Sequence, residues 1–174
     1  MGKDAAAGQG LFSQEWRTLT PGEVALCRSV FPDPLAFEDV RLIDGPRAND
    51  FAEAAFRNRN TAITLRRTIY FGTRWCGDYS CADDEGRRLF LHEMTHVWQW
   101  RRFGVFGFLR RYARDFRACR CNAAAMYRYE LDELPFSASR LEAQAEMVGD
   151  YQRAAGSHRA LIERKLSGTG FYGL

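Results

Sequence analysis

Residues 83–102 read DDEGRRLFLHEMTHVWQWRR, a sequence with the pattern of an α-helix. Acidic residues open it and arginines close it, which is the charge order that the dipole of an α-helix favours. Its apolar residues occupy most of the circumference of such a helix: Leu89, Phe90, Leu91, Met94, Val97, Trp98 and Trp100. A helix that is apolar on most sides is normally buried. We therefore expect a core helix over 83–102, with the rest of the domain packed around it.

Inside this helix, residues 92–96 read HEMTH, an HExxH motif. Four residues advance an α-helix by about 400°, so His92 and His96 stack on one face, one turn apart. Two imidazoles in that arrangement can bind one Zn²⁺ at about 2.0–2.1 Å. Glu93 lies about 100° further round the helix, where a glutamate serves as general base toward the water that zinc activates. The alternative is structural: two core histidines bonded to carbonyl oxygens, and Glu93 paired with an arginine.

A catalytic zinc site normally takes three protein ligands and leaves one position for water, so a third ligand must lie further along the chain. The extended motif HExxHxxGxxH is excluded, because Gln99 and Arg102 occupy its glycine and third histidine positions. His158, the remaining histidine, would be one answer.

Glu142 is the favoured third ligand. It lies in the stretch SRLEAQAE over 139–146, one helical turn before Glu146. Leu141, Ala145 and Val148 form an apolar stripe beside Glu142, which predicts that its carboxylate lies at the edge of the core. A carboxylate there needs a partner, and a cation held by the two histidines would be one.

Shorter elements are expected before the buried helix. Residues 20–23, TPGE, form a helix start with threonine as N-cap, and the helix should run to about Val30. Residues 39–44 alternate as a strand does and end at a Gly-Pro turn signal. Residues 61–71, TAITLRRTIYF, are rich in β-branched and aromatic residues, which predicts either one long strand or two short strands folded at Arg66-Arg67. The hairpin is the favoured interpretation.

Less regular structure follows. Residues 117–136 read as irregular, with a short extended piece at 126–131. Three later helices are expected: over about 108–116 after Gly104 and Gly107, from Ser137 or Ser139 to Ala155, and from Ser157 to Lys165. Residues 1–10 are expected to be a flexible tail, and residues 11–174 a single domain.

Composition agrees with one globular domain: 174 residues, of which 46% are hydrophobic and 27% are charged. No stretch has the roughly 18–20 uncharged apolar residues of a bilayer span, and the first ten residues lack the apolar block of a secretory signal. Five cysteines without CxxC spacing favour reduced thiols. We expect a cytoplasmic location by default, with export by a leaderless route as the alternative.

The net charge is +3, and Lys3 and Lys165 are the only lysines among 25 basic residues. Eight arginines lie between Arg101 and Arg128, which would suit a nucleic-acid surface. No nucleic-acid motif accompanies them, so a solvated helix face is the favoured interpretation. A nucleic-acid-associated protease is kept as the least favoured hypothesis.

HEMTHVWQW at 92–100 and SRLEAQAEMVGDY at 139–151 together resemble the gluzincin class of zinc metallopeptidases, in which a glutamate on a later helix completes HExxH. The stretches LTPGEVALCRSVFPDPLAFEDVRL and NTAITLRRTIYFG resemble small bacterial Vgr-related proteins, some of which occur near secreted toxins and contractile injection systems. The resemblance covers roughly Leu19 to Tyr151.

This resemblance implies an α+β, zincin-like single domain, with a small antiparallel β-element against the metal helix. It implies that His92, His96 and Glu142 bind zinc, that Glu93 is the base, and that Glu146 orients a ligating histidine. It also implies that an edge strand within 61–71 binds extended substrate. Arg66 and Arg67 would bias that edge toward acidic chains; the alternative is a turn with two exposed charges.

The predicted activity is hydrolysis of peptide bonds in a peptide or protein substrate. The oxyanion of the transition state needs a further donor. The candidates, among which the sequence does not choose, are Tyr127, Tyr129, Tyr151 and His158. The alternative from another functional class is a catalytically weak, zinc-stabilised interaction module that binds secretion-system components. Retention of Glu93 argues against it, because a structural ion needs no base.

Overall fold

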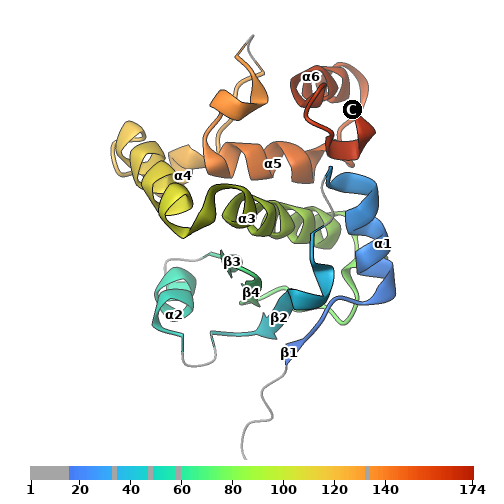
Figure 1. Ribbon diagram of the computed structural model, residues 1–174, viewed down its shortest axis with the longest axis vertical. Coiled ribbons are helices and arrows are strands. Elements are labelled where there is room, and N and C mark those ends of the chain that lie inside the picture. The colour runs from blue at the N-terminus through green and yellow to red at the C-terminus, as the bar shows by residue number, and fades with distance from the viewer. Residues whose placement is uncertain (1–15, 33–34, 47–48, 58–59, 132–133) are drawn as a thin grey trace, which may run out of the picture.

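Helix α3, Asp84–Ala118, runs through the middle of the molecule. A four-stranded sheet lies on one side of it, and α5, Leu141–Tyr151, lies on the other (Figure 1). The computed structural model describes residues 16–32, 35–46, 49–57, 60–131 and 134–174; the tail predicted over 1–10 lies outside these ranges. In the described part of the chain, the predicted α+β class and single domain are confirmed.

The local sequence explains where α3 begins and bends. The Asp83 side chain caps it by accepting a hydrogen bond from the backbone N–H of Gly86 at 2.7 Å. At Gly104 the backbone leaves helical geometry, with φ 66° and ψ 176°, a conformation that glycine adopts at little cost. The helix resumes directly after this kink and ends at Ala118, so the separate helix expected from Phe108 is wrong in its start, and Gly107 stays helical.

The sheet has the order β1-β2-β4-β3. The predicted hairpin is confirmed: β3, Ala62–Leu65, pairs antiparallel with β4, Thr68–Phe71. However, β2, Arg41–Asp44, runs parallel to β4, so the expectation of a purely antiparallel element is wrong. The reason is the connection after β2, which leads to β3 at the sheet edge before the chain returns to β4. The two-residue β1, Trp16–Arg17, adds an antiparallel strand at the opposite edge.

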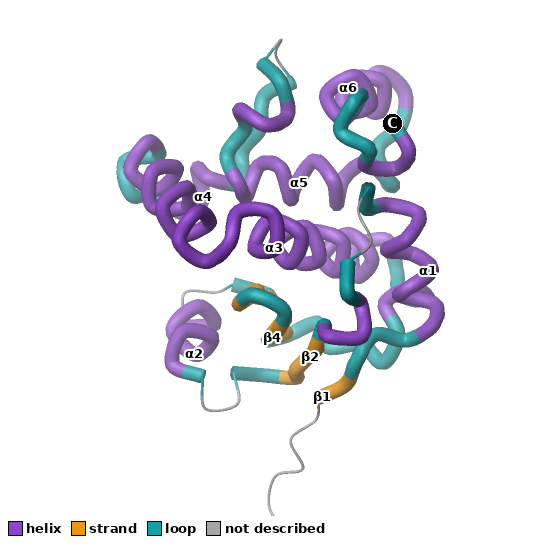
Figure 2. Tube along the Cα trace, in the orientation of Figure 1, coloured by secondary structure: helices purple, strands orange, loops and turns teal. Residues whose placement is uncertain are grey.

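Helix α2, Asp50–Arg57, belongs to this connection and was not predicted. Asn49 caps it, because its side-chain oxygen accepts from the N–H of Ala52 at 3.0 Å. A short helix, α4, Ala123–Met126, lies within the stretch expected to be irregular, and residues 127–131 form no strand, so the extended piece expected there is wrong. Figure 2 shows the strands on one side of α3, and α5 with α6, Gly156–Leu166, on the other.

Helix α5 does not begin with the serine N-cap that was expected. Neither Ser137 nor Ser139 caps it; the Asp115 carboxylate of α3 accepts from the Leu141 N–H at 3.1 Å instead. The helix ends at Tyr151, four residues before the expected end. Similarly, α6 begins at Gly156 without a serine cap. A cap supplied from a distant helix leaves no local sequence signal.

The core fills the space between the sheet, α3 and α5. Its fully buried members include Leu42, Ile69, Phe71, Phe90, Met94 and Met147. All five cysteines are free. None of the helices in the described ranges is long and apolar enough to cross a membrane.

The capping box predicted at residues 20–23 is confirmed for α1, Pro21–Val30, and its glutamate has a second role. Glu23 is fully buried, and Arg17 donates to its two oxygens at 2.7 Å each. The backbone N–H of Tyr79 donates to the same carboxylate at 2.8 Å. Glu23 therefore joins α1, β1 and the loop before α3.

We expect Glu23→Ala to lower the free energy of unfolding by about 3 kcal/mol, because Arg17 would lose its anionic partner in a partly buried site and the Tyr79 N–H would lose its acceptor. Urea unfolding followed by circular dichroism measures this. Glu53→Ala is the matched control: it removes an exposed ion pair with Arg57 and should cost less than about 0.5 kcal/mol. Equal losses in the two variants would contradict the role of Glu23.

Candidate metal centre

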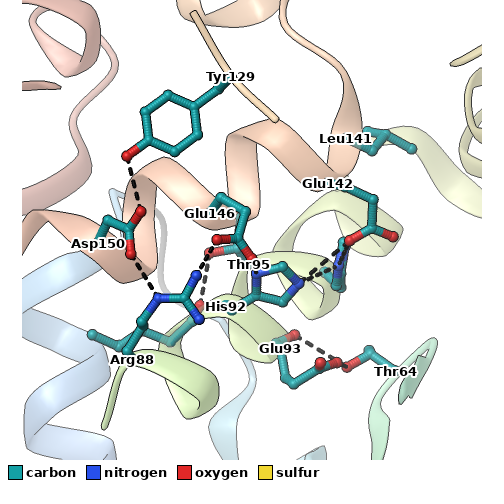
Figure 3. A network of polar contacts seen from close by, with 12 residues as sticks. Thr64, Arg88, His92, Glu93, Thr95, Tyr129, Leu141, Glu142, Glu146 and Asp150 are labelled. Atoms are coloured by element: carbon teal, nitrogen blue, oxygen red, sulfur yellow. Dashed lines mark hydrogen bonds and ion pairs between the residues drawn. The ribbon is translucent and has the colours of Figure 1, made fainter. Parts of the chain in front are cut away.

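Three predicted ligands, His92, His96 and Glu142, converge between α3 and α5. Figure 3 labels His92 and Glu142 of this cluster. His92 Nε2 lies 3.1 Å from His96 Nε2, and Glu142 Oε2 lies 3.3 Å from the first and 3.1 Å from the second. The three residues are only 4% to 6% exposed. His158, the alternative third ligand, is exposed and lies outside this cluster.

Gln99 fixes the protonation of His96. Its side-chain N–H group donates to the Leu141 carbonyl at 2.9 Å and to Gln144 Oε1 at 3.1 Å. The amide oxygen of Gln99 therefore faces His96 Nδ1, 2.8 Å away, and can only accept. Nδ1 must carry the proton, which leaves the lone pair of His96 Nε2 pointing toward His92 and Glu142.

Glu146 has the corresponding place beside His92. One of its carboxylate oxygens, Oε1, lies 3.1 Å from His92 Nδ1, and the other is ion-paired with Arg88. The contact with His92 is too poorly aligned for a hydrogen bond, but an anion beside Nδ1 still favours a proton there. Arg88 is held in turn by Asp150 at 2.6 Å, and the Tyr129 hydroxyl donates to Asp150 at 2.9 Å (Figure 3).

The three converging atoms fit a zinc ion. When both imidazoles are neutral and carry their proton on Nδ1, the converging atoms are two nitrogen lone pairs and a carboxylate oxygen, a set of acceptors that favours a cation at its centre. Ligands at about 2.0–2.1 Å from a tetrahedral zinc are about 3.3–3.4 Å apart, close to the separations found here. Two imidazoles and one carboxylate are also donors that zinc favours.

The electrostatics of the cluster agree with this. Burial lowers the pKa of His92, but Glu142 and Glu146 raise it by more than burial lowers it, and the resulting pKa is about 10. Burial raises the pKa of Glu142, but His96 and His92 lower it more, well below its usual range. The site therefore stabilises positive charge at its centre.

Glu93 lies beside the cluster without joining it. It is 4% exposed, and its Oε2 accepts a hydrogen bond of 2.7 Å from the Thr64 hydroxyl on β3 (Figure 3). The same hydroxyl lies 3.2 Å from the Glu93 carbonyl oxygen. Thr64 thus fixes the orientation of the carboxylate, a role that sequence analysis missed. A polar side chain in the middle of an otherwise apolar strand was the available signal.

A cavity of about 220 Å³ opens onto His92, Glu93, His96 and Glu142. Its walls are the strand β3 on one side and aromatic or apolar residues on the other: Trp100, Phe108, Leu109, Tyr112 and Tyr127. The cavity is large enough to admit a short piece of an extended chain. The segment after the Gly104 kink supplies much of the apolar wall.

Of the four predicted oxyanion donors, the structure brings one to this cavity. The Tyr127 ring stacks on His92 with centroids 5.9 Å apart, and burial followed by the Glu142 charge raises the pKa of Tyr127, so its hydroxyl stays protonated. Tyr129 contacts Asp150 and lies 3.4 Å from His158, and Tyr151 packs on Tyr172. These three residues do not line the cavity.

Tyr112 is a second phenol in the cavity, and sequence analysis did not consider it. It stacks on Phe108, and burial together with the Glu142 charge raises its pKa. Its position depends on the bend at Gly104, which cannot be placed from local sequence alone.

Comparison with known proteins relates the chain to proteins of bacterial secretion systems. The family described as eCIS core domain matches residues 31–104. That segment holds β2, β3, β4 and α3 as far as the kink, and therefore contains both histidines and Glu93.

One protein of known name that is similar in sequence is VgrG2b of Pseudomonas aeruginosa, a type VI secretion system spike protein. It is 35% identical over 100 residues, which is 56% of this chain and 8% of VgrG2b. The solved effector domain of VgrG2b superposes with a TM-score of 0.63 at 28% identity, over 96% of this chain and 86% of that domain. The chain is thus homologous to that effector domain, and the predicted relation to Vgr proteins is confirmed.

Glu146→Gln should weaken zinc binding about 10- to 100-fold, because a neutral amide holds the His92 ring less firmly than a carboxylate does. Competition with a chromogenic chelator measures the affinity. Glu163→Gln, the same change on the exposed face of α6, is the control and should leave the affinity unchanged. An unaltered affinity in Glu146→Gln would remove Glu146 from the site.

Proposed function

We propose that this domain is a zinc-dependent peptidase of the gluzincin type with a zincin-like fold. The observation that carries the proposal is the convergence of three acceptor atoms, from His92, His96 and Glu142, beside the carboxylate of Glu93. A site that only stabilised the fold would close the fourth position of the metal, whereas here a cavity leads to it.

Zinc bound by these residues would polarise a substrate carbonyl and lower the pKa of a water molecule toward ~7. Glu93 accepts the proton of that water and later passes it to the leaving amine. Thr64 holds the Glu93 carboxylate in one orientation during both transfers. The Tyr127 hydroxyl, which has no hydrogen-bond partner among the described residues, is the proposed donor to the oxyanion, with Tyr112 as the second candidate.

The biological setting follows from the relatives. We infer that the domain acts as an effector delivered by a secretion system, with components of that system as partners and a peptide or protein as substrate. Homology to the VgrG2b effector domain supports this inference.

A second candidate function is a zinc-stabilised interaction module of a secretion system. The comparisons favour it to the extent that VgrG2b is described as a spike protein. Glu93 and the cavity distinguish the two functions, because an interaction module uses neither.

The test is a comparison of the zinc-loaded wild-type chain with Glu93→Gln on an unfolded protein substrate. The peptidase proposal requires hydrolysis by the wild type, its loss in the variant, and equal zinc content in both. A wild type that holds zinc and cleaves nothing would leave the interaction module as the function.

A further inference from the structure

A second cavity, of about 380 Å³, lies next to the one at the metal centre. The two cavities share Trp100 as a wall, and both follow the hairpin: the first along Ala62–Leu65, and the second at Arg66 and Arg67. Val40, Val97 and Leu35 supply apolar lining in the second cavity. The two cavities thus adjoin at Trp100, one at the metal centre and the other at the hairpin turn, and together they are called the groove below.

Strand β3 is the edge of the sheet on this side. In its antiparallel pairing with β4, Ile63 and Leu65 bond to the neighbouring strand, so the backbone groups of Ala62 and Thr64 point away from the sheet. Trp100 Nε1 already donates to the Thr64 carbonyl from that side, at 3.3 Å. An extended chain can pair with such an edge, and its side chains then alternate into the groove.

The far end of the groove is positively charged. Arg66, Arg67 and Arg101 line it together. Arg67 is ion-paired with Asp39, whereas Arg66 is exposed and has no ion-pair partner in the part of the chain that the structure describes. Arg66 also has a φ of 61°, the left-handed region that favours glycine. A long cationic side chain thus occupies a turn position where glycine would cost less.

We propose that this arginine-lined end of the groove binds an acidic side chain of the peptide substrate, and that Arg66 determines this specificity. The proposal rests on the proposed function, because the groove leads from the metal centre. Arg66 follows Thr64, whose hydroxyl contacts Glu93, by two residues, so an extended chain along β3 places the acidic residue about two to four positions from the hydrolysed bond. Its carboxylate meets guanidinium groups, and its neighbours rest on the apolar floor.

The test measures binding rather than hydrolysis. Fluorescein-labelled, alanine-rich peptides carry a single aspartate at each position in turn, and each is paired with the same peptide carrying asparagine. Fluorescence anisotropy measures the binding of each peptide to the zinc-loaded Glu93→Gln variant. This variant is used because it lacks the proposed general base and should not cleave the peptide during the measurement. We expect the best aspartate peptide to bind about threefold more tightly than its asparagine partner, with the difference decreasing as salt is raised.

Arg66→Glu in the same background should abolish or reverse this preference. Arg28→Glu, the same charge change on the exposed face of α1, should preserve it. Equal binding of each pair, an equal effect of the two substitutions, or no binding of any peptide would overturn the proposal. Hydrolysis by the wild type is scored separately: a wild type that cleaves nothing refutes the peptidase, while the binding ratios still decide whether the groove selects acidic chains.

Discussion

Replacing Glu142 with alanine should weaken zinc binding by at least about a hundredfold. Loss of a residue that only orients a metal ligand costs about 10- to 100-fold in affinity, and loss of a ligand itself should cost at least as much. The variant keeps His92 and His96 but loses the carboxylate oxygen that lies 3.1 Å from His96 Nε2 and 3.3 Å from His92 Nε2. Two neutral imidazoles alone bind the ion in an incomplete site. Isothermal titration of the metal-free protein with zinc measures the change.

Thermal unfolding gives an independent readout of the same ligand. A ligand at a hundred times its Kd stabilises a folded protein by about 2.7 kcal/mol, so removal of zinc by a chelator should lower the Tm of the wild type. The Tm of Glu142→Ala should fall much less than that of the wild type when the chelator is added. Glu163→Ala, an exposed substitution on α6, should behave as the wild type does. Wild-type zinc affinity in Glu142→Ala would contradict its assignment as a ligand.

Residues whose relative positions follow from helical periodicity could be predicted from the sequence. The spacing of His92 and His96 places both on one face of any α-helix, and the position of Glu146 one turn after Glu142 works in the same way. The capping box at residues 20–23 is also local, since its two hydrogen bonds join residues three apart. Such features need no knowledge of the tertiary fold.

The features that could not be predicted from the sequence depend on contacts between segments that lie far apart in the chain. Thr64 lies 29 residues from Glu93, and the choice of Tyr127 over Tyr129 depends on how the chain turns after α4. The parallel pairing of β2 with β4 follows from the path through α2. That helix did carry a local signal, Asn49 followed by acidic and apolar residues, but no expectation was drawn from it.

The two residues that orient the histidines illustrate both cases. Gln99 follows His96 by three positions, so it lies on the same helix face as that histidine. Its amide becomes informative only when Leu141 and Gln144 of α5 fix which end faces His96. The same holds for Glu146, whose approach to His92 is secured by Arg88 from the other helix.

Glu93→Gln should lower kcat for peptide hydrolysis by about 10²- to 10⁴-fold, the usual contribution of a positioned general base. The substitution keeps the size of the side chain, and Thr64 can donate to the amide oxygen as it does to the carboxylate. An amide cannot accept a proton from water at neutral pH. Zinc content should stay at the wild-type level, because Glu93 is not one of the three residues whose donor atoms converge.

The combination of outcomes is what makes this variant decisive. Loss of zinc together with activity would show that Glu93 supports the metal site rather than the proton transfer. Retention of zinc and of activity would show that another residue is the general base. The amide keeps the hydrogen bond to Thr64, so the substitution tests the proton transfer and not the position of the side chain. Glu130→Gln, the same change at an exposed position, controls for the altered charge. Only intact zinc with lost turnover fits a general base that lies beside the proposed metal ligands, is held by a hydroxyl from the edge strand, and faces the cavity proposed to admit substrate.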